Sequence, residues 1–215
     1  MIDFSKQAMV LAAGLGTRLR PLTLDTPKPL LSISEGICCL GLALEHLHRQ
    51  KMDRIVVNTY YLAEQITLFV KQNYPAVHLS HECEPLETGG GVLNALPHFD
   101  LTHPLLIVNS DTYIEDRVAV DLGVQMLTAF DPSREDILLA VSQKSWAIGH
   151  EETNLGQFEG EHKSRASIEG ASIKGDYDFK NDPKENRRLA YRPNGKSAEF
   201  VFVSHRVVMP SFIKA

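Results

Sequence analysis

The sequence is poor in cysteine, has no excess of basic residues and contains no long apolar stretch, and each shortage excludes a class of protein. Three cysteines in 215 residues, two of them adjacent, cannot form the disulfide framework of a small secreted domain, so we expect a reducing, cytoplasmic location. The 22 Lys and Arg residues are outnumbered by 27 Asp and Glu residues, which argues against nucleic acid as a partner. The longest apolar stretches, such as residues 105–108 and 137–141, are far shorter than the roughly 20 residues of a membrane-spanning helix, so no membrane partner is expected.

What remains is the composition of an ordinary globular protein. Apolar residues make up 43% of the chain and charged residues 23%. A chain of this length and composition can bury one hydrophobic core. We therefore expect a single domain over residues 1–215.

Short apolar segments alternate with amphipathic segments along most of the chain. Leu40, Ala43, Leu44 and Leu47 recur with helical spacing, and polar residues lie between them. Short buried strands that alternate with such helices form parallel sheets covered on both faces, so the predicted fold is α/β, a Rossmann-like, mostly parallel sheet flanked by helices. The predicted strands are residues 9–13, 54–58, 77–80, 105–108 and 137–141, and the predicted helices are residues 40–47, 62–70, 90–96 and 118–130.

The pattern changes after residue 142. Residues 144–196 are rich in Gly, Asn, Asp, Lys and Glu and show little periodicity, which predicts a loop-rich insertion, a ligand lid or a partly disordered segment. Residues 198–208 return to a β pattern.

The first predicted strand leads directly into Gly14-Leu15-Gly16. Glycines at this place let backbone N–H groups approach phosphate oxygens closely, because no Cβ stands in the way. The segment is not a Walker loop, since no Gly-Lys-Ser/Thr follows, and it lacks the third glycine of the dinucleotide fingerprint. It continues with Arg18 and with Lys28, which lies between two prolines, so two cations accompany the glycines. Together these residues predict a phosphate-binding loop.

This loop and two later segments resemble the signature of the sugar-1-phosphate nucleotidyltransferases, the pyrophosphorylases that make nucleotide sugars. The later segments are residues 82–91, Glu-Cys-Glu-Pro-Leu-Glu-Thr-Gly-Gly-Gly, and residues 109–111, Asn-Ser-Asp. They most resemble the branch of the N-acetylmuramate-1-phosphate uridylyltransferases and bacterial mannose-1-phosphate guanylyltransferases. The resemblance is dense over residues 7–115 and implies the nucleotide-diphospho-sugar transferase fold. It also implies transfer of a nucleoside monophosphate from UTP or GTP to a sugar-1-phosphate, with release of pyrophosphate, in nucleotide-sugar biosynthesis for the cell envelope.

The same resemblance implies roles for individual residues. The backbone of Leu11, Ala12, Ala13 and Gly14 would line the base and ribose, and Gly16 and Thr17 would meet the triphosphate. Arg18 would hold the phosphates that leave as pyrophosphate, and Lys28 would bridge the α-phosphate and the incoming sugar phosphate. Asp111 would bind Mg²⁺, although a strand-end aspartate can also cap a helix. Further nucleotide-binding residues implied are Glu82, Pro85, Thr88, Gly89 and Asn109, and the implied sugar-phosphate residues are Gly175 and Asp176.

The prediction of which nucleotide base the protein prefers rests on Glu82. Related enzymes commonly have a Gln at this place that reads the base edge, whereas an ionised carboxylate can only accept hydrogen bonds. Uracil and guanine present N–H donors on that edge, while adenine and cytosine present ring-nitrogen acceptors. We therefore expect UTP or GTP over ATP or CTP, unless Glu82 faces solvent.

The chain departs from the family pattern at its end. A second metal carboxylate is expected in an Asp-x-Gly-Thr motif after the last β segment, but the sequence stops at Ala215, which suggests a truncated C-terminus. Asp121-Leu122-Gly123 resembles the motif, yet it lies too early and lacks the Thr. An active nucleotidyltransferase that uses Mg²⁺, as monomer or homodimer, is the prediction. The alternatives are a differently completed metal site, a catalytically weak or inactive nucleotide-sugar-binding regulatory relative, and a phosphocholine-type cytidylyltransferase.

Overall fold

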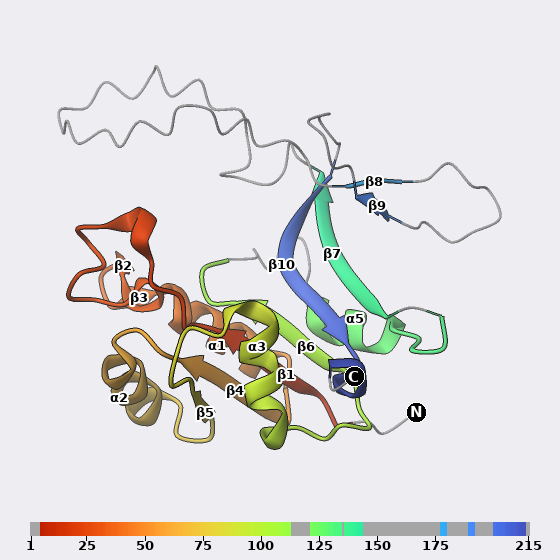
Figure 1. Ribbon diagram of the computed structural model, residues 1–215, viewed down its shortest axis with the longest axis horizontal. Helices are drawn as coiled ribbons and strands as arrows, with labels where there is room; N and C mark the ends of the chain where they lie inside the picture. The colour runs from red at the N-terminus through yellow and green to blue at the C-terminus, as the bar shows by residue number, and fades with distance from the viewer. Residues whose placement is uncertain are drawn as a thin grey trace, which may run out of the picture. The chain divides into compact units, whose positions relative to one another are not determined.

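The computed structural model describes residues 5–112, 121–134, 136–143, 177–179, 189–191 and 200–213 (Figure 1). The chain divides into two compact units, one formed by Met1–Leu139 with Ser204–Ala215 and the other by Ala140–Val203. The predicted extent of one domain over residues 1–215 stays a prediction. None of the helices in the described ranges is long and apolar enough to cross a membrane.

The first unit is built on a mostly parallel sheet. Its strands β1 (Gln7–Leu11), β4 (Arg54–Thr59), β5 (His78–His81) and β6 (Leu105–Asn109) are parallel and lie in the order β5-β4-β1-β6 (Figure 1). The last residues of β10 (Phe200–Val208) pair antiparallel with β6 at its free edge. This arrangement confirms the predicted α/β fold with a mostly parallel sheet.

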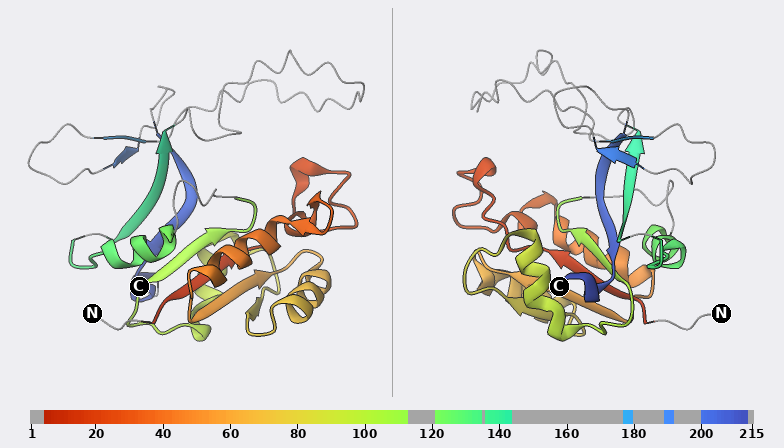
Figure 2. Two further views of the ribbon diagram at one scale, coloured as in Figure 1. Left: turned by 180° about the vertical axis from the view of Figure 1, so that it is seen from behind. Right: turned by 45° about the vertical axis from the view of Figure 1, so that its right-hand side comes forward.

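Helices cover both faces of this sheet (Figures 1 and 2). Helix α3 (Glu87–Ala95) lies on one face and contacts the short helix α6 (Pro210–Ile213). Helix α1 (Cys39–Arg49) lies on the other face, where α2 (Ala63–Asn73) packs against it through Tyr74, whose hydroxyl donates to the carbonyl of Gly41 at 3.2 Å. Helix α5 (Leu122–Ala129) packs on β6 beside the end of α1.

The core follows from strand alternation. Successive side chains of a strand point to opposite faces, so a strand buried on both faces is apolar throughout. Ala8, Met9 and Val10 of β1 are each 0% exposed. The cluster beneath α3 combines residues of four strands, β1, β4, β6 and β10, with residues of α3 and with Phe99; its members are Met9, Val56, Val92, Ala95, Phe99, Leu105, Ile107 and Val208.

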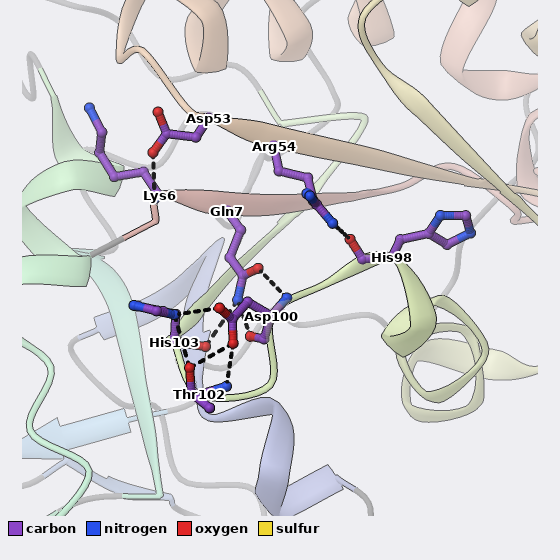
Figure 3. Close-up of polar contacts among 8 residues, drawn as sticks. All are labelled: Lys6, Gln7, Asp53, Arg54, His98, Asp100, Thr102 and His103. Atoms are coloured by element: carbon purple, nitrogen blue, oxygen red, sulfur yellow. Dashed lines mark hydrogen bonds and ion pairs between the residues drawn. The ribbon is translucent and has the colours of Figure 1, made fainter. Parts of the chain in front are cut away.

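The amino end of β1 is anchored by a buried glutamine. The Gln7 side chain, 0% exposed, donates to the carbonyls of Asp100 at 2.7 Å and His103 at 3.0 Å and accepts from the Asp100 amide at 2.9 Å (Figure 3). The hydrogen bonds of Gln7 therefore hold the loop before β6 against β1. They lie at the amino ends of these strands, and the phosphate-binding loop follows the carboxyl end of β1.

Element boundaries differ from the sequence-based ones in places. Strand β1 ends at Leu11 and not at residue 13, because the next amide, that of Ala12, bonds to a side chain and not to a neighbouring strand. Helix α3 begins three residues earlier than predicted, at Glu87. The strands β2 (Ser32–Ser34) and β3 (Ile37–Cys38), which form a small hairpin, and the 3-10 helices η1 (Thr17–Leu19), η2 (Lys28–Leu30) and η3 (Leu96–His98) were not predicted. Residues 118–120 of the predicted helix 118–130 lie outside the described residues.

The second unit is described only in part. Strand β8 (Tyr177–Phe179) pairs antiparallel with β9 (Leu189–Tyr191), and Phe200 of β10 pairs with Tyr177. Strand β7 (Ile137–Gln143) pairs with β10, and both strands begin in one unit and end in the other. Most of the predicted loop-rich insertion 144–196, including Gly175 and Asp176, lies outside the described residues.

Candidate active site

The site lies where the order of the strands reverses. The chain goes from β1 outward to β4 and β5 and then crosses back to β6 on the other side of β1. Ligands of open α/β sheets bind at such a switch point, in the crevice outside the carboxyl ends of the strands. The segment after Leu11 and the segment after Asn109 leave the sheet here side by side, and the Ser110 amide donates to the Leu11 carbonyl at 3.1 Å. The structure thus brings the two predicted site segments together.

Lys28 and Asp111 form an ion pair at this crevice. The Lys28 ammonium group donates to Oδ2 of Asp111, and about a third of each side chain is exposed, 31% and 34%. Lys28 is the first residue of η2, whose fixed geometry comes from the prolines on both sides, and Asp111 follows β6. The predicted cation, Lys28, and the predicted metal ligand, Asp111, therefore lie next to each other.

Gly16 connects the glycine loop to this pair. Its φ of +62° is left-handed, and a Cβ there would lie 3.0 Å from Cγ2 of Thr23 and 3.1 Å from Cβ of Lys28. The buried Thr23 hydroxyl donates to the Gly16 carbonyl at 2.9 Å. Only glycine fits this backbone and this approach without strain. Lys28 is therefore packed directly against the loop that leads to it.

The outer part of the loop is open to solvent and held from behind. Gly14, Thr17 and Arg18 are exposed, and a Cβ on Gly14 would meet nothing within 4 Å. Within the described residues Arg18 makes no hydrogen bond or ion pair. The Tyr61 hydroxyl contacts the carbonyls of Thr23 at 2.9 Å and Leu24 at 3.1 Å, which supports the loop from the segment before α2. The predicted phosphate-binding groups thus face solvent on a supported backbone.

Glu82 is part of a buried hydrogen-bonded chain. Its side chain is 2% exposed, Oε1 accepts from Nδ2 of Asn58 at 2.7 Å and Oε2 accepts from the Leu86 amide at 3.3 Å. The Oδ1 atom of Asn58 in turn accepts from the Ala12 amide at 2.7 Å. Both carboxylate oxygens thus have partners within the protein, and Glu82 does not face solvent. Its role in base choice stays a prediction.

The other predicted nucleotide-binding residues belong to the start of α3 and the end of β6. Pro85, Thr88 and Gly89 are exposed at the start of α3, and a Cβ on Gly89 would meet nothing within 4 Å. Asn109 ends β6, and its amide donates to the Ser204 hydroxyl at 2.8 Å. The sugar-phosphate residues Gly175 and Asp176 lie outside the described residues, so their role stays a prediction.

Asp121-Leu122-Gly123, which resembles the second metal motif, has a structural role. Asp121 precedes α5, and a Cβ on Gly123 would lie 2.6 Å from Cδ2 of Leu106 and 2.7 Å from Oε1 of Gln50. The glycine is therefore needed for close packing of α5 on the sheet.

Asp111 fits a metal site that is completed by substrate. Among the described residues no three His, Cys, Asp or Glu side chains gather in a way that could hold a metal. Mg²⁺, however, is commonly bound by one or two carboxylates together with waters and substrate phosphates. A partly exposed aspartate at the mouth of a phosphate loop suits that kind of site.

The charges of the ion pair reach the thiol of Cys39, at the start of α1. Burial raises the pKa of this thiol, the carboxylate of Asp111 and the neighbouring Cys38 raise it further, and the ammonium group of Lys28 opposes them. Burial and negative charge both disfavour the thiolate. The surroundings of Cys39 therefore do not activate its thiol as a nucleophile.

Two supporting residues, Asn58 and Tyr61, were not identified from the sequence. Asn58 gave the clearer signal, because it is a polar residue directly after Ile-Val-Val in a predicted strand, and the structure shows that it is 3% exposed. A buried amide in such a strand needs hydrogen-bond partners. That requirement predicts partners but does not identify them.

An α/β sheet with a glycine loop, a lysine and an aspartate at its switch point is typical of proteins that bind nucleotide phosphates. Residues 7–147 match the family described as nucleotidyl transferase, and the chain belongs to this family. This confirms the resemblance found in the sequence.

Two relatives in sequence and one solved structure are consistent with this assignment. The chain is 35% identical over 161 residues to the N-acetylmuramate alpha-1-phosphate uridylyltransferase of Caulobacter vibrioides, which covers 71% of this chain and 64% of that protein. It is 38% identical over 115 residues to the mannose-1-phosphate guanylyltransferase catalytic subunit beta of Drosophila pseudoobscura pseudoobscura, covering 49% of this chain and 29% of that one. The chain thus spans less than two thirds of either relative. The fold is similar to the crystal structure of HddC from Yersinia pseudotuberculosis complexed with GMP-PN, with a TM-score of 0.66, 22% identity, and coverage of 97% of this chain and 79% of that one.

Proposed function

We propose that this protein transfers a nucleoside monophosphate from UTP or GTP to a sugar-1-phosphate and releases pyrophosphate, forming a nucleotide sugar. The observation that carries the proposal is the Lys28–Asp111 pair beside Gly16, at the switch point of the sheet. Two relatives named for uridylyl and guanylyl transfer to sugar-1-phosphates support the choice of substrates.

In this reaction the protein has to neutralise and align two polyanions, the nucleoside triphosphate and the sugar phosphate. An oxygen of the sugar phosphate attacks the α-phosphorus of the triphosphate, and the bond to the leaving pyrophosphate breaks. The attacking oxygen is already ionised, so no general base is needed, and rate comes from positioning and from stabilising charge. Lys28, exposed on one side, can contact both phosphates. The Arg18 side chain is exposed and makes no hydrogen bond or ion pair with another described residue, so it can hold the leaving phosphates.

Asp111 is the residue we propose as the protein ligand of Mg²⁺. The bound ion would neutralise phosphate oxygens and orient the leaving group. Before substrate arrives, Lys28 supplies the positive charge beside Asp111. Binding of the magnesium–nucleotide complex would therefore exchange one cation for another at this carboxylate and release Lys28 toward the phosphates.

A pyrophosphate-release panel tests the function. The protein is incubated with Mg²⁺, each of the four triphosphates, and N-acetylmuramate 1-phosphate, mannose 1-phosphate or heptose 1-phosphate. We expect release that depends on sugar phosphate and is fastest with UTP or GTP. No release with any pair, under conditions where the protein is folded, would overturn the proposal of an active enzyme. Turnover confined to CTP with a phosphocholine-type acceptor would instead favour a cytidylyltransferase.

Binding measurements distinguish the inactive alternative. A catalytically weak regulatory relative would bind a nucleotide sugar in calorimetry and yet show no exchange of labelled pyrophosphate. An active enzyme shows both. We further propose that the protein works in the cytoplasm as a monomer or homodimer, supplying nucleotide sugars for the cell envelope; light scattering and fractionation check these points.

A further inference from the structure

A chain of buried hydrogen bonds connects the start of α3 with the first residue of the glycine loop. The Leu86 amide donates to Glu82 Oε2, Asn58 Nδ2 donates to Glu82 Oε1, and the Ala12 amide donates to Asn58 Oδ1. Ala12, Asn58 and Glu82 are 3%, 3% and 2% exposed. The strand register explains the meeting, because Val57 pairs with Val10 and Asn58 is therefore level with the last residue of β1.

The carboxylate of Glu82 determines which way the Asn58 amide faces. An ionised carboxylate only accepts hydrogen bonds, so the Asn58 side chain must turn its NH₂ group toward Glu82. Its carbonyl oxygen then has to face the Ala12 amide. If the amide were flipped, two acceptors would meet at Glu82 and two donors at Ala12, which is costly in a buried place. The charge on Glu82 thus orients the group that holds Ala12.

The pair is enclosed by a glycine of α3. A Cβ on Gly91 would lie 2.6 Å from Oε1 of Glu82 and 2.9 Å from Nδ2 of Asn58. Gly91 has no left-handed φ, so the need for glycine here comes from the close approach and not from the backbone. Helix α3 therefore fits directly over the pair and excludes water from it.

Ala12 is the residue through which these hydrogen bonds can affect the site. Its amide is the first one after β1, and the next residues form the loop that reaches Gly16 and Lys28. On the other side, the Leu11 carbonyl accepts from Ser110, the residue before Asp111. Asn58 therefore fixes where the glycine loop leaves the sheet relative to both charged residues.

We propose that Asn58 and Glu82 are positioning residues that set the geometry of the nucleotide loop through the Ala12 amide. This inference rests on the proposed function, because it concerns the same site. It differs from direct base reading by Glu82: positioning affects the binding of every triphosphate by a similar factor, whereas base reading changes the ratio between UTP or GTP and ATP or CTP.

An exchange of the two side-chain types tests the proposal. In Glu82→Gln, one side-chain oxygen becomes an NH₂ group, which then faces either the Asn58 NH₂ or the Leu86 amide. In Asn58→Asp, two carboxylates face each other. In the double variant Asn58→Asp/Glu82→Gln, the new amide at position 82 donates to the new carboxylate at position 58 and accepts from the Leu86 amide. That carboxylate in turn accepts from the Ala12 amide, so every hydrogen bond is restored and the net charge is unchanged.

Gln7 provides a matched control on the same sheet. It is 0% exposed and makes three hydrogen bonds, like the pair, but at the amino end of β1, away from the loop (Figure 3). Gln7→Glu is also an exchange between amide and acid, and it removes the two donated bonds. We expect it to lower the melting temperature and to leave nucleotide affinity unchanged.

The measurements are Kd and KM for all four triphosphates with Mg²⁺, and the melting temperature of each variant. We expect each single variant to weaken binding of every triphosphate about tenfold or more, and the double variant to return to within about threefold of the parent. If a single variant does not fold, folding and nucleotide binding of the double variant decide the matter.

Several results would overturn the inference and leave the proposed function intact. These are parent-like affinity in both single variants, a double variant no better than the worse single variant, and an equal loss of affinity in Gln7→Glu. A change in the UTP and GTP preference in Glu82→Gln that Asn58→Asp does not reverse would show that Glu82 reads the base. If the parent protein itself binds no triphosphate, the proposed function fails and this inference fails with it.

Discussion

The ammonium group of Lys28 contacts the carboxylate of Asp111, which lies 83 positions further along the chain. One residue comes from a proline-flanked 3-10 turn and the other from the end of β6. Neither is deeply buried, so the attraction between them is screened by water and contributes little to folding. The pair is better suited to exchange partners when a magnesium–nucleotide complex binds.

Replacement of Lys28 tests its catalytic role. Because an exposed ion pair stabilises by only about 0–1 kcal/mol, Lys28→Ala is expected to keep a nearly unchanged melting temperature. Loss of a charge that stabilises the transition state should lower kcat by about 10²–10³-fold or more. Pyrophosphate release measures the rate, and Lys71→Ala, an exposed lysine on α2, is the control. Near-parental turnover in Lys28→Ala would contradict the transferase function.

Asp111→Asn tests the proposed metal ligand. We expect it to lose both turnover and the dependence of nucleotide binding on Mg²⁺, because the main carboxylate at the site is gone. Calorimetric titration of nucleotide with and without Mg²⁺ measures this dependence. Glu64→Gln, at an exposed carboxylate on α2, should behave like the parent. Parental affinity for the magnesium–nucleotide complex in Asp111→Asn would mean that Asp111 does not bind the ion.

Two glycines with similar backbones separate strain from crowding at the site. Gly16 and Gly36 have φ values of +62° and +72°, so alanine at either costs about 1–2 kcal/mol of folding free energy. A Cβ at Gly36 meets nothing within 4 Å, whereas one at Gly16 presses on Thr23 and Lys28. Urea unfolding should show losses for both, while kinetics should show lost activity for Gly16→Ala alone. Equal activity in the two variants would argue against close packing of Lys28 on the loop.

Alkylation of Cys39 reports on the ion pair in solution. Since burial and the charge of Asp111 raise the thiol pKa, the reaction with iodoacetamide should accelerate only at a pH above that of an unperturbed thiol. Asp111→Asn removes a charge that raises the pKa, so it should shift this profile to lower pH. Lys28→Met removes the charge that lowers the pKa and should shift it to higher pH. Mass spectrometry follows Cys39 separately, and shifts of the same sign in both variants would contradict the geometry.

Much of the fold could be predicted because it depends on local patterns. Apolar strands and the helical spacing of Leu40, Ala43, Leu44 and Leu47 are set by burial on one or both faces, and the structure confirms the sheet they imply. The hairpin β2–β3 was missed because its strands are short and mostly exposed. The early end of β1 was missed because Ala12 is as apolar as the strand before it, and only its partner Asn58 distinguishes it.

The sequence by itself determined the glycine loop, Lys28 and Asp111, because each is specified by residue type and by near neighbours such as the flanking prolines. Only the tertiary structure decided that Lys28 meets Asp111 and that Glu82 bonds to Asn58 and not to solvent. These contacts join residues 83 and 24 positions apart, and strand register and the crossover from β5 to β6 bring them together. In a strand, a register shift of one residue would turn Asn58 to the opposite face, so no pattern within the segment itself can specify its partner.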